Sequence, residues 1–583
     1  MSLTMFSKKK NKDSNAAQDA TSTKKSPSVS NEDYIDIQTV AKARKWVSGL
    51  PLTDMGSTTR KLFLALTQLN QDSINPQVRI DVTEVLLPYV RMVLENLDRH
   101  FLSRSFPLPE RSQKIVDLRK SLLMETAGSY QLAALEMLTK RMVSKKKLLL
   151  SLDRAIKHMS QVLVNGYEVY GKVDKTVWHD LHHLFLMACE NGLDKKAAPK
   201  KEDVNDDEIS IDNQYKLINL LALSAPNTLR QGEVIRVHDF FKACLGDVSI
   251  LTNPAAIKAK YAHIALLNSD EPASLMPVSD LVNSPTSRIF DLSIIISHLD
   301  QFVSLSEKTD LGKHEKWPML THSLAKRLVY VLTTIRNRRY KRFPRDEKLV
   351  LAIRMADVIE IIRENQVDSF SEELNADVED DNIYEALSNE DDISSPWAEP
   401  DVDALASGRN IQLYTWKAEN SSSGGYGLRQ IKRESSTARV GELVAIKDPK
   451  DEKEFWQIAV TRWMDSFSDE GLRIGLEILS LHGVTVRVDE IINREITQKL
   501  PVEGVLLPTI DGARKEANLI FPGFIFQPGD ELTMTLGSRQ QHITINSVDD
   551  TVGNFSYCGF DNREIEEVVE GTLESFGDVW EFL

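Results

Sequence analysis

One ten-residue segment of this chain concentrates positive charge. Between positions 336 and 345 it carries six cations, namely Arg336, Arg338, Arg339, Lys341, Arg342 and Arg345. The formal net charge of the whole chain is −15, and so dense a local positive field is typical of a site that holds an anion. Arginine suits this task because its planar guanidinium offers several donors at once to phosphate oxygens or to a guanine edge.

A second polar segment follows further along the chain. It reads Asn420-Ser421-Ser422-Ser423-Gly424-Gly425 and opens a β-rich stretch. The short side chains of Asn420 and Ser422 can hydrogen-bond to a base edge, and Gly425 lets the backbone approach closely or take a positive φ. On its own the segment is typical of a flexible turn. Together with the basic segment it predicts one shared ligand site.

The two segments resemble the signature of the PilZ family, which comprises bacterial receptors for cyclic di-GMP. The spacing R-x-x-x-R falls on Arg338 and Arg342, and [D/N]-x-S-x-x-G falls on Asn420, Ser422 and Gly425. Asparagine stands here where aspartate is commoner in the family, and it keeps an acceptor oxygen while adding an amide donor.

Two weaker landmarks of the PilZ family follow in order. The stretch 440–444 resembles its glycine turn and following strand, and the stretches 458–463 and 473–478 resemble its closing strand pair. The resemblance covers roughly residues 336–485.

The resemblance implies cyclic di-GMP as the ligand and a set of residues that bind it. That set comprises Arg338, Arg339, Arg342, Asn420, Ser422 and Gly425, with Arg345 and Gly424 as accessory positions. It also implies a receptor that couples the level of the second messenger to an output protein in surface motility, pili, adhesion or exopolysaccharide production. The arginine segment joins a helical module to the barrel, so ligand is expected to reorient that module. The alternative is an interaction adaptor in the same type of pathway whose PilZ-like barrel has lost the ligand.

Composition places the chain among multidomain globular proteins. With 583 residues, 42% hydrophobic and 27% charged, it is too long for one ordinary core. Its three cysteines, Cys189, Cys244 and Cys558, are far apart and lack C-x-x-C spacing, which argues against a disulfide framework and leads us to expect no metal or cofactor. No secretory leader and no apolar run of about 20 residues is evident, so we expect a cytoplasmic protein without membrane insertion.

The pattern of apolar residues changes near position 336. Residues 34–335 are mostly helical in pattern, as in 77–102, where apolar residues recur at spacings of three and four. After 345, short runs rich in β-branched residues alternate with turns. Within these parts we expect helices over 122–152, 288–305 and 319–336, a short strand over 262–267 and a strand over 349–362.

These patterns predict a multidomain α + β fold. A large N-terminal helical module precedes a PilZ-like six-stranded antiparallel β-barrel and a further small β-rich C-terminal unit. The expected limits are 1–33 for a disordered basic tail, 34–335 for the helical module with a possible linker near 194–207, 336–490 for the barrel, and 500–583 for the C-terminal unit with an acidic tail.

An acidic insertion interrupts the barrel region. Residues 364–408 contain fifteen Asp or Glu and no Lys or Arg, which equals the formal imbalance of the whole chain. Such a segment buries too little apolar surface to offset chain entropy, so we expect it to be disordered or loosely ordered.

Other chemistries find less support in the sequence. His179 and His183 stand at i and i+4, as a zinc pair on a helix would, and Val237-His238-Asp239 adds another histidine, but no further ligands follow at a matching spacing. Signatures of diguanylate cyclases, EAL phosphodiesterases, Walker A loops and G-x-S-x-G elbows are absent by inspection. We therefore expect no enzyme activity. The net negative charge also disfavours nucleic acid as the partner of the basic segment.

Overall fold

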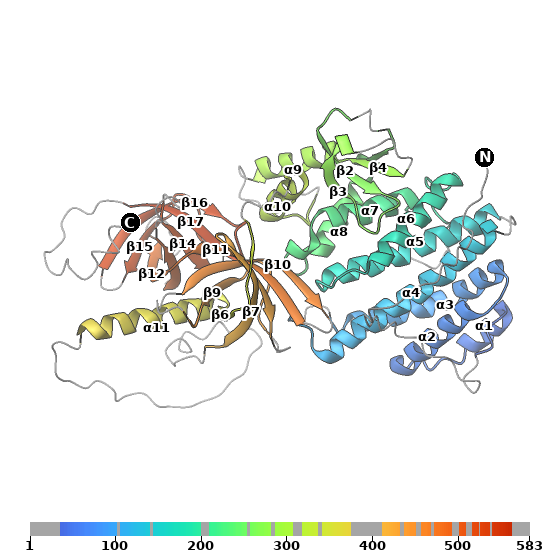
Figure 1. Cartoon of the computed structure of the whole chain (residues 1–583), viewed down its shortest axis with the longest axis horizontal. Helices are drawn as coiled ribbons and strands as arrows, with labels where there is room; N and C mark the ends of the chain where they lie inside the picture. The colour runs from blue at the N-terminus through green and yellow to red at the C-terminus, as the bar shows by residue number, and fades with distance from the viewer. Residues whose placement is uncertain are drawn as a thin grey trace, which may run out of the picture.

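Helices occupy one end of the molecule and two β-barrels occupy the other (Figure 1). The computed structural model describes residues 35–101, 105–139, 144–199, 209–253, 257–280, 286–306, 317–335, 341–374, 411–431, 436–450, 456–467, 471–491, 501–508, 516–523, 525–536 and 539–562. The expected tail 1–33, the last part of the chain from 563 onward and most of the predicted linker and acidic insertion lie outside these residues.

Amphipathic helices build the first part of the chain. They are α1 (Val40–Val47), α2 (Met55–Gln71), α3 (Pro76–Asp98), α4 (Glu110–Thr139), α5 (Lys145–Glu168), α6 (Lys175–Glu190), α7 (Ile211–Leu223) and α8 (Glu233–Ala243). Several begin at an N-cap that satisfies a backbone donor, as where Asp54 accepts from the Ser57 amide at 3.0 Å. The helices share one apolar core. The stretch 122–152, predicted as continuous helix, is divided between α4 and α5.

A small antiparallel sheet follows the helices. Its strands are β1 (Ser249–Leu251), β2 (Tyr261–Leu266), β3 (Ser274–Pro277) and β4 (Ser287–Asp291), in the order β1-β4-β2-β3. The strand predicted at 262–267 is confirmed. The helix predicted from 288 is wrong at its start, because β4 pairs with both β1 and β2 before α9 (Ser293–Ser306) begins. Helix α10 (His322–Thr333) ends this part of the chain.

The first barrel is a closed ring of six antiparallel strands. Its strands are β6 (Lys348–Ile353), β7 (Leu413–Ser422), β8 (Gly425–Gln430), β9 (Leu443–Lys447), β10 (Gln457–Phe467) and β11 (Gly471–Ser480), with the short strand β5 (Phe343–Pro344) added beside β7. The ring runs β7-β6-β9-β10-β11-β8, and the β7–β8 pairing closes it. The predicted six-stranded barrel is confirmed.

The strand predicted over 349–362 ends at Ile353, and the chain continues as helix α11 (Met355–Leu374). Arg354 has a positive φ of 96° at the junction and pairs with Asp357 in the first helical turn, at 2.9 Å. Val358 and Ile362 lie four residues apart and are both buried. They contact apolar side chains of both barrels, which explains why a β-branched run is helical here. The first residues of the predicted acidic insertion therefore continue this helix.

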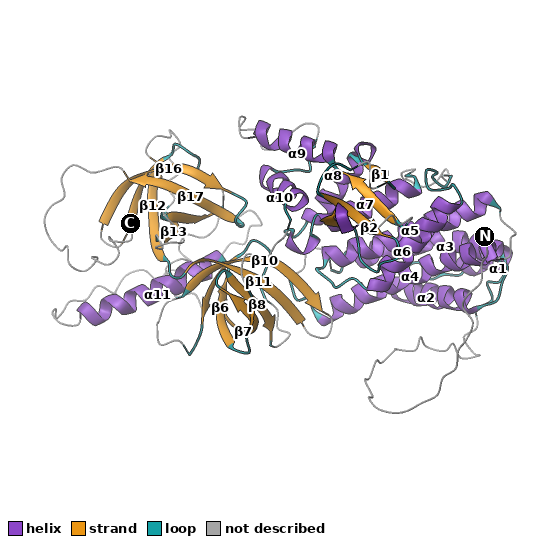
Figure 2. Cartoon of the chain, turned by 45° about the horizontal axis from the view of Figure 1, so that its top comes forward, coloured by secondary structure: helices purple, strands orange, loops and turns teal. Residues whose placement is uncertain are grey.

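The C-terminal unit is a second closed barrel (Figure 2). Its strands are β12 (Val484–Ile491), β13 (Val502–Leu507), β14 (Asn518–Pro522), β15 (Glu531–Leu536), β16 (Arg539–Asp549) and β17 (Phe555–Asn562), joined in the order β12-β13-β14-β17-β16-β15. A β-rich unit was predicted, and closure leaves it no free sheet edge.

The helical part completes the core of the first barrel. Phe106 and Tyr170 are 3% and 4% exposed and belong to the same apolar cluster as Trp416 of β7. Their rings meet edge to face with centroids 5.1 Å apart. The Ser466 amide donates to the Tyr170 carbonyl at 2.7 Å. The helices and the first barrel therefore share one core.

The turn between β16 and β17 joins all three parts. Arg230 donates to the carbonyls of Asp550 and Gly553 at 2.9 and 2.6 Å. Ser323 of α10 donates to the same Asp550 carbonyl at 2.9 Å. From the first barrel, Arg462 donates to the Val552 carbonyl at 2.6 Å. We call residues 549–554 the junction turn.

Candidate functional site

Strand pairing brings the two predicted halves of the ligand site together. In β5, Phe343 pairs with Ser421 and Pro344 pairs with Asn420. Continuing this antiparallel register places Arg342 across from Ser422. Arg338 and Arg339 lie outside the described residues, so their placement stays a prediction.

Arg342 is exposed and lies directly before β5. Among the described residues its guanidinium has no hydrogen-bond or ion-pair partner, so its five donors face solvent beside the β7–β8 hairpin. An anion at this edge of the barrel can therefore accept hydrogen bonds from the Arg342 guanidinium without breaking an existing ion pair among the described residues.

Arg345, the predicted accessory residue, is already engaged. Its Nε donates to the Ser421 hydroxyl at 3.0 Å, and its Nη1 donates to Glu347 at 3.0 Å. Its backbone amide donates to the Glu419 carbonyl at 3.0 Å. These bonds fasten the arginine segment to β7, so Arg345 positions the site.

The hairpin tip is held tightly against β11. Ser422 donates to the Gly425 carbonyl at 3.4 Å, and the Ile478 amide donates to the Gly424 carbonyl at 3.1 Å. A Cβ at Gly425 would lie 1.9 Å from the carbonyl oxygen of Leu476. Only glycine allows this close approach of two backbones.

A pair of facing glycines lies next to the hairpin on the outer face of the barrel, and neighbouring side chains bury both of them. Gly427 of β8 pairs with Gly475 of β11. The Asn420 side chain covers Gly427, where a Cβ would meet its Oδ1 at 2.8 Å, and the Trp463 indole covers Gly475, where a Cβ would meet its Nε1 at 1.9 Å. This glycine platform, made of Gly427 and Gly475 and bordered by Asn420 and Trp463, was missed from the sequence. The signal was present as glycines inside strands, which often mark close approach of a ligand or another group.

Charged residues flank the glycine platform. Arg429 of β8 lies opposite Arg473 of β11 in the strand register. Both form ion pairs with the Glu419 carboxylate, and the Arg429 contact is 3.4 Å long. On β7, Lys417 pairs with Asp346, and this hydrogen bond holds the pKa of the Asp346 carboxyl below its usual value. Glu419 thus neutralises cations that would otherwise compete with Arg342 for an anion. Its role could not be inferred from the sequence, because it depends on strand register.

The histidines considered as metal ligands are not grouped with further ligands among the described residues. Neither His179 nor His183 belongs to any group of three possible ligands within the described residues. His182 between them is buried and contacts the Tyr215 hydroxyl at 2.7 Å and the Glu271 carbonyl at 2.8 Å. Burial lowers the pKa of His182, which keeps its ring neutral in this hydrogen-bonded position.

Every helix among the described residues is too short or too polar to cross a lipid bilayer.

A six-stranded barrel with an N-x-S-x-x-G turn at its closing hairpin is the architecture of a PilZ domain. Family models agree: residues 362–484 match the middle PilZ domain of the cyclic-di-GMP receptor FimW, and residues 41–277 match the N-terminal domain of the same receptor. The chain therefore contains a PilZ domain, and the resemblance predicted from its motifs is confirmed.

A curated relative extends this similarity along the chain. The cyclic-di-GMP receptor FimW of Pseudomonas aeruginosa strain PAO1 is 24% identical over 584 aligned residues, which cover 93% of this chain and 93% of the relative. No solved structure matches the chain. The arginine segment 336–345 lies outside both family-model ranges, so these two matches do not bear on it.

Proposed function

We propose that this protein is a receptor for cyclic di-GMP and binds it on the outer face of the first barrel. The observation that carries the proposal is the β5–β7 pairing, which sets Arg342 beside Asn420 and Ser422. The name of the Pseudomonas relative supports the choice of ligand.

The chemistry of the site fits the ligand. Cyclic di-GMP carries two phosphates and two guanine bases, and an arginine fork can bond to either a phosphate or the O6 and N7 atoms of guanine. Arg342 is available for this role, and the sequence places Arg338 and Arg339 within the same segment. A charge-assisted hydrogen bond contributes on the order of 1.5–3 kcal/mol.

The glycine platform sets the position of two side chains that a purine can contact. Gly427 and Gly475 are buried and present no side chain of their own, so Asn420 and Trp463 pack directly against the backbone there. The Trp463 side chain is half-buried, and its indole provides an aromatic surface for stacking. Asn420 can bond to the base edge through either its amide or its carbonyl group.

Titration calorimetry of the full chain with cyclic di-GMP tests the proposal. Arg342→Ala should weaken binding about tenfold or more, because at least one charge-assisted bond is lost. The Arg338→Ala/Arg342→Ala double variant should bind more weakly still. Arg44→Ala is the matched control, since Arg44 is exposed on α1, far from the barrel in sequence, and should leave binding unchanged.

The outcomes separate two functions. Binding that is lost in the double variant and is specific against GTP supports the receptor. No heat with any nucleotide would instead favour the interaction adaptor, in which the barrel serves only to bind proteins. A receptor also gains about 2.7 kcal/mol of stability at a hundredfold ligand excess over its Kd, and Arg342→Ala should reduce that gain.

For the output we propose that ligand acts through α10. The chain runs from α10 directly into the arginine segment, and the start of α10 is fastened to the junction turn by Ser323. Arg327 of α10 also pairs with Glu233 of α8 at 2.5 Å. Rotation of the whole helical part would break the core that Phe106 and Tyr170 share with the barrel. We therefore place the movement in α10, in α9 and in the β1–β4 sheet, which pack against α10. An output protein would detect the movement there.

A further inference from the structure

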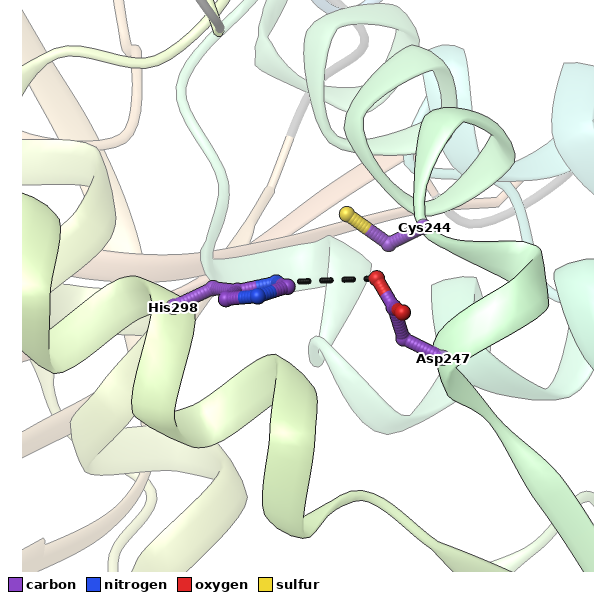
Figure 3. Close-up of side chains that lie close together, drawn as sticks. All are labelled: Cys244, Asp247 and His298. Carbon is purple, nitrogen blue, oxygen red and sulfur yellow. Dashed lines mark ion pairs between the residues drawn. The ribbon is translucent and has the colours of Figure 1, made fainter.

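Three possible metal ligands meet where α8, α9 and a short 3-10 turn come together. They are Cys244 at the end of α8, Asp247 at the end of the 3-10 helix η3 (Leu245–Asp247), and His298 on α9. One ligand atom of each lies within 4.8 Å of the other two. Figure 3 shows the sulfur and the carboxylate on the same side of the imidazole ring. The position is remote in sequence from the glycine platform and its hairpin.

The imidazole of His298 directs its Nδ1 atom at this point. Nδ1 of His298 is sheltered from solvent and has no hydrogen-bond partner among the described residues. The nearest carboxylate oxygen, Oδ2 of Asp247, is 3.6 Å away, which is too long for a good hydrogen bond. A buried nitrogen left unsatisfied in this way is costly, and a metal ion would satisfy it.

Aromatic packing fixes the orientation of that ring. Trp317 lies against His298 with ring centroids 5.1 Å apart, and Phe240 of α8 packs edge to face on Trp317 at 5.9 Å. The ring therefore holds its direction whether or not an ion is bound. Such preorganisation lowers the entropy cost of binding.

The ligand atoms are close to the spacing of a tetrahedral site. With bonds of about 2.0–2.3 Å, zinc holds a nitrogen and an oxygen roughly 3.3–3.5 Å apart and each of them about 3.5 Å from a sulfur. The 3.6 Å between Nδ1 of His298 and Oδ2 of Asp247 is slightly longer, and all three ligand atoms lie within 4.8 Å of one another, so a small closure of the side chains would complete the site. One sulfur, one nitrogen and one oxygen donor together favour a borderline ion such as Zn²⁺ over Mg²⁺ or Ca²⁺, which prefer oxygen alone.

The three possible ligands differ in their exposure to solvent. Cys244 is 2% exposed, whereas the side chains of His298 and Asp247 are 21% and 39% exposed. The sulfur thus lies on the inner side and the carboxylate at the rim. An ion can enter past Asp247, and a water molecule can reach the remaining position.

We propose that Cys244, Asp247 and His298 bind one zinc ion, with water as the fourth ligand. On binding, the sulfur of Cys244 coordinates as a thiolate and the thiol proton passes to solvent. The ion fastens α9 to the end of α8 and so stabilises the helical part beside α10. The proposal differs from the expectation that the chain takes no metal, because the three ligands come from positions that show no recognisable spacing in the sequence.

Cobalt titration of the full chain, prepared without a histidine tag and stripped of metal with a chelator, tests the proposal. Co²⁺ should bind at one ion per chain and produce both d–d bands and a thiolate-to-cobalt charge-transfer band, and Zn²⁺ should displace it. Cys244→Ser should abolish the charge-transfer band. Cys189→Ser, which removes a half-buried cysteine that is not in the trio, should keep it.

Asp247→Asn provides a second test of the site if Cys244→Ser fails to fold. Asp247 lies at the rim, so the substitution should leave the fold intact and weaken cobalt binding at least tenfold. Zinc should also raise the melting temperature of the wild-type protein but not of Asp247→Asn at the same concentration. Absence of a one-to-one complex in the wild type, or a charge-transfer band that survives Cys244→Ser, would show that the trio is only an ion pair beside a thiol.

Discussion

At the scale of single residues, the arginines of one segment divide into two roles. Arg342 is exposed and unpaired among the described residues. Arg345, in contrast, donates hydrogen bonds to Ser421 and Glu347. The sequence indicated the hairpin because its turn is a local pattern of residue type, and the ligand-binding role of the arginine segment stays a prediction. The sequence did not reveal Glu419, Trp463 or the glycine platform, because each of these depends on which residue faces which across β8, β10 and β11.

A half-buried carboxyl near the shared core gives a residue-scale prediction about pH. Burial raises the pKa of Glu168, at the end of α5, from 4.5 to about 7, although Arg119 partly opposes the shift. Below about pH 4.5 this group is protonated in both folded and unfolded chains. Between about pH 4.5 and 7 the unfolded chain releases the proton while the folded chain keeps it, so the folded state loses stability progressively, by on the order of 1–3 kcal/mol, and the loss is complete above about pH 7.

Glu168→Gln should remove this loss. The variant should melt at about the same temperature as the wild type at pH 5 and at a higher temperature at pH 8. Glu95→Gln, on the exposed face of α3, is the control and should not change the difference between the two pH values. A wild type that melts no lower than Glu168→Gln at pH 8 would contradict the proposed burial of the charge.

At the scale of elements, the sequence predicted most helices and strands and erred where an apolar run was short. Residues 349–353 form a strand and 355–362 a helix, although both are rich in β-branched residues. Periodicity over so few residues does not separate the two. The change from strand to helix is set by the positive φ at Arg354 and by packing, because one buried face of α11 contacts both barrels.

The insertion of the helical part into the first barrel gives an element-scale prediction. Phe106→Ala should destabilise the protein by about 3–5 kcal/mol, because it leaves a cavity between the Tyr170 ring and the strands. Denaturant unfolding followed by circular dichroism measures this. Leu52→Ala, where the side chain is 44% exposed, should cost little and serves as the control.

Loss of this contact should also change how the protein unfolds. If Phe106 and Tyr170 join the helices and the barrel into one cooperative unit, the variant should unfold in two separate calorimetric transitions. A destabilisation below about 1 kcal/mol with a single unchanged transition would show that the two parts do not depend on their shared core.

At the scale of the whole molecule, the junction turn connects three units by hydrogen bonds. Arg230, Ser323 and Arg462 all bond to backbone carbonyls of one turn in the second barrel. Burial lowers the pKa of Arg230 to about 10, with a further contribution from Arg327, and the guanidinium stays charged at neutral pH. No pattern in the sequence could predict this junction, because its partners are separated by up to 323 residues along the chain.

The acidic residues of the insertion lie close in sequence to the arginine segment of the same barrel. Residues 375–408 contain eleven Asp or Glu and no Lys or Arg, within the same barrel region as the arginine segment. Their negative field should repel the phosphates of cyclic di-GMP, and their carboxylates should compete for the arginines that we propose bind it. Replacing the eleven acids by Asn or Gln keeps the chain length and leaves α11 intact, so it changes the charge alone.

The neutralised variant should bind cyclic di-GMP more tightly than the wild type at low salt. The gain should shrink as salt rises, because the screening length falls from about 30 Å at 0.01 M to about 10 Å at 0.1 M. Calorimetric titration at the two salt concentrations measures both effects. Equal affinities of the two proteins at both concentrations would mean that the acidic residues do not compete for the site, and a tightening that persists unchanged at high salt would point to direct contact between the acids and the arginines.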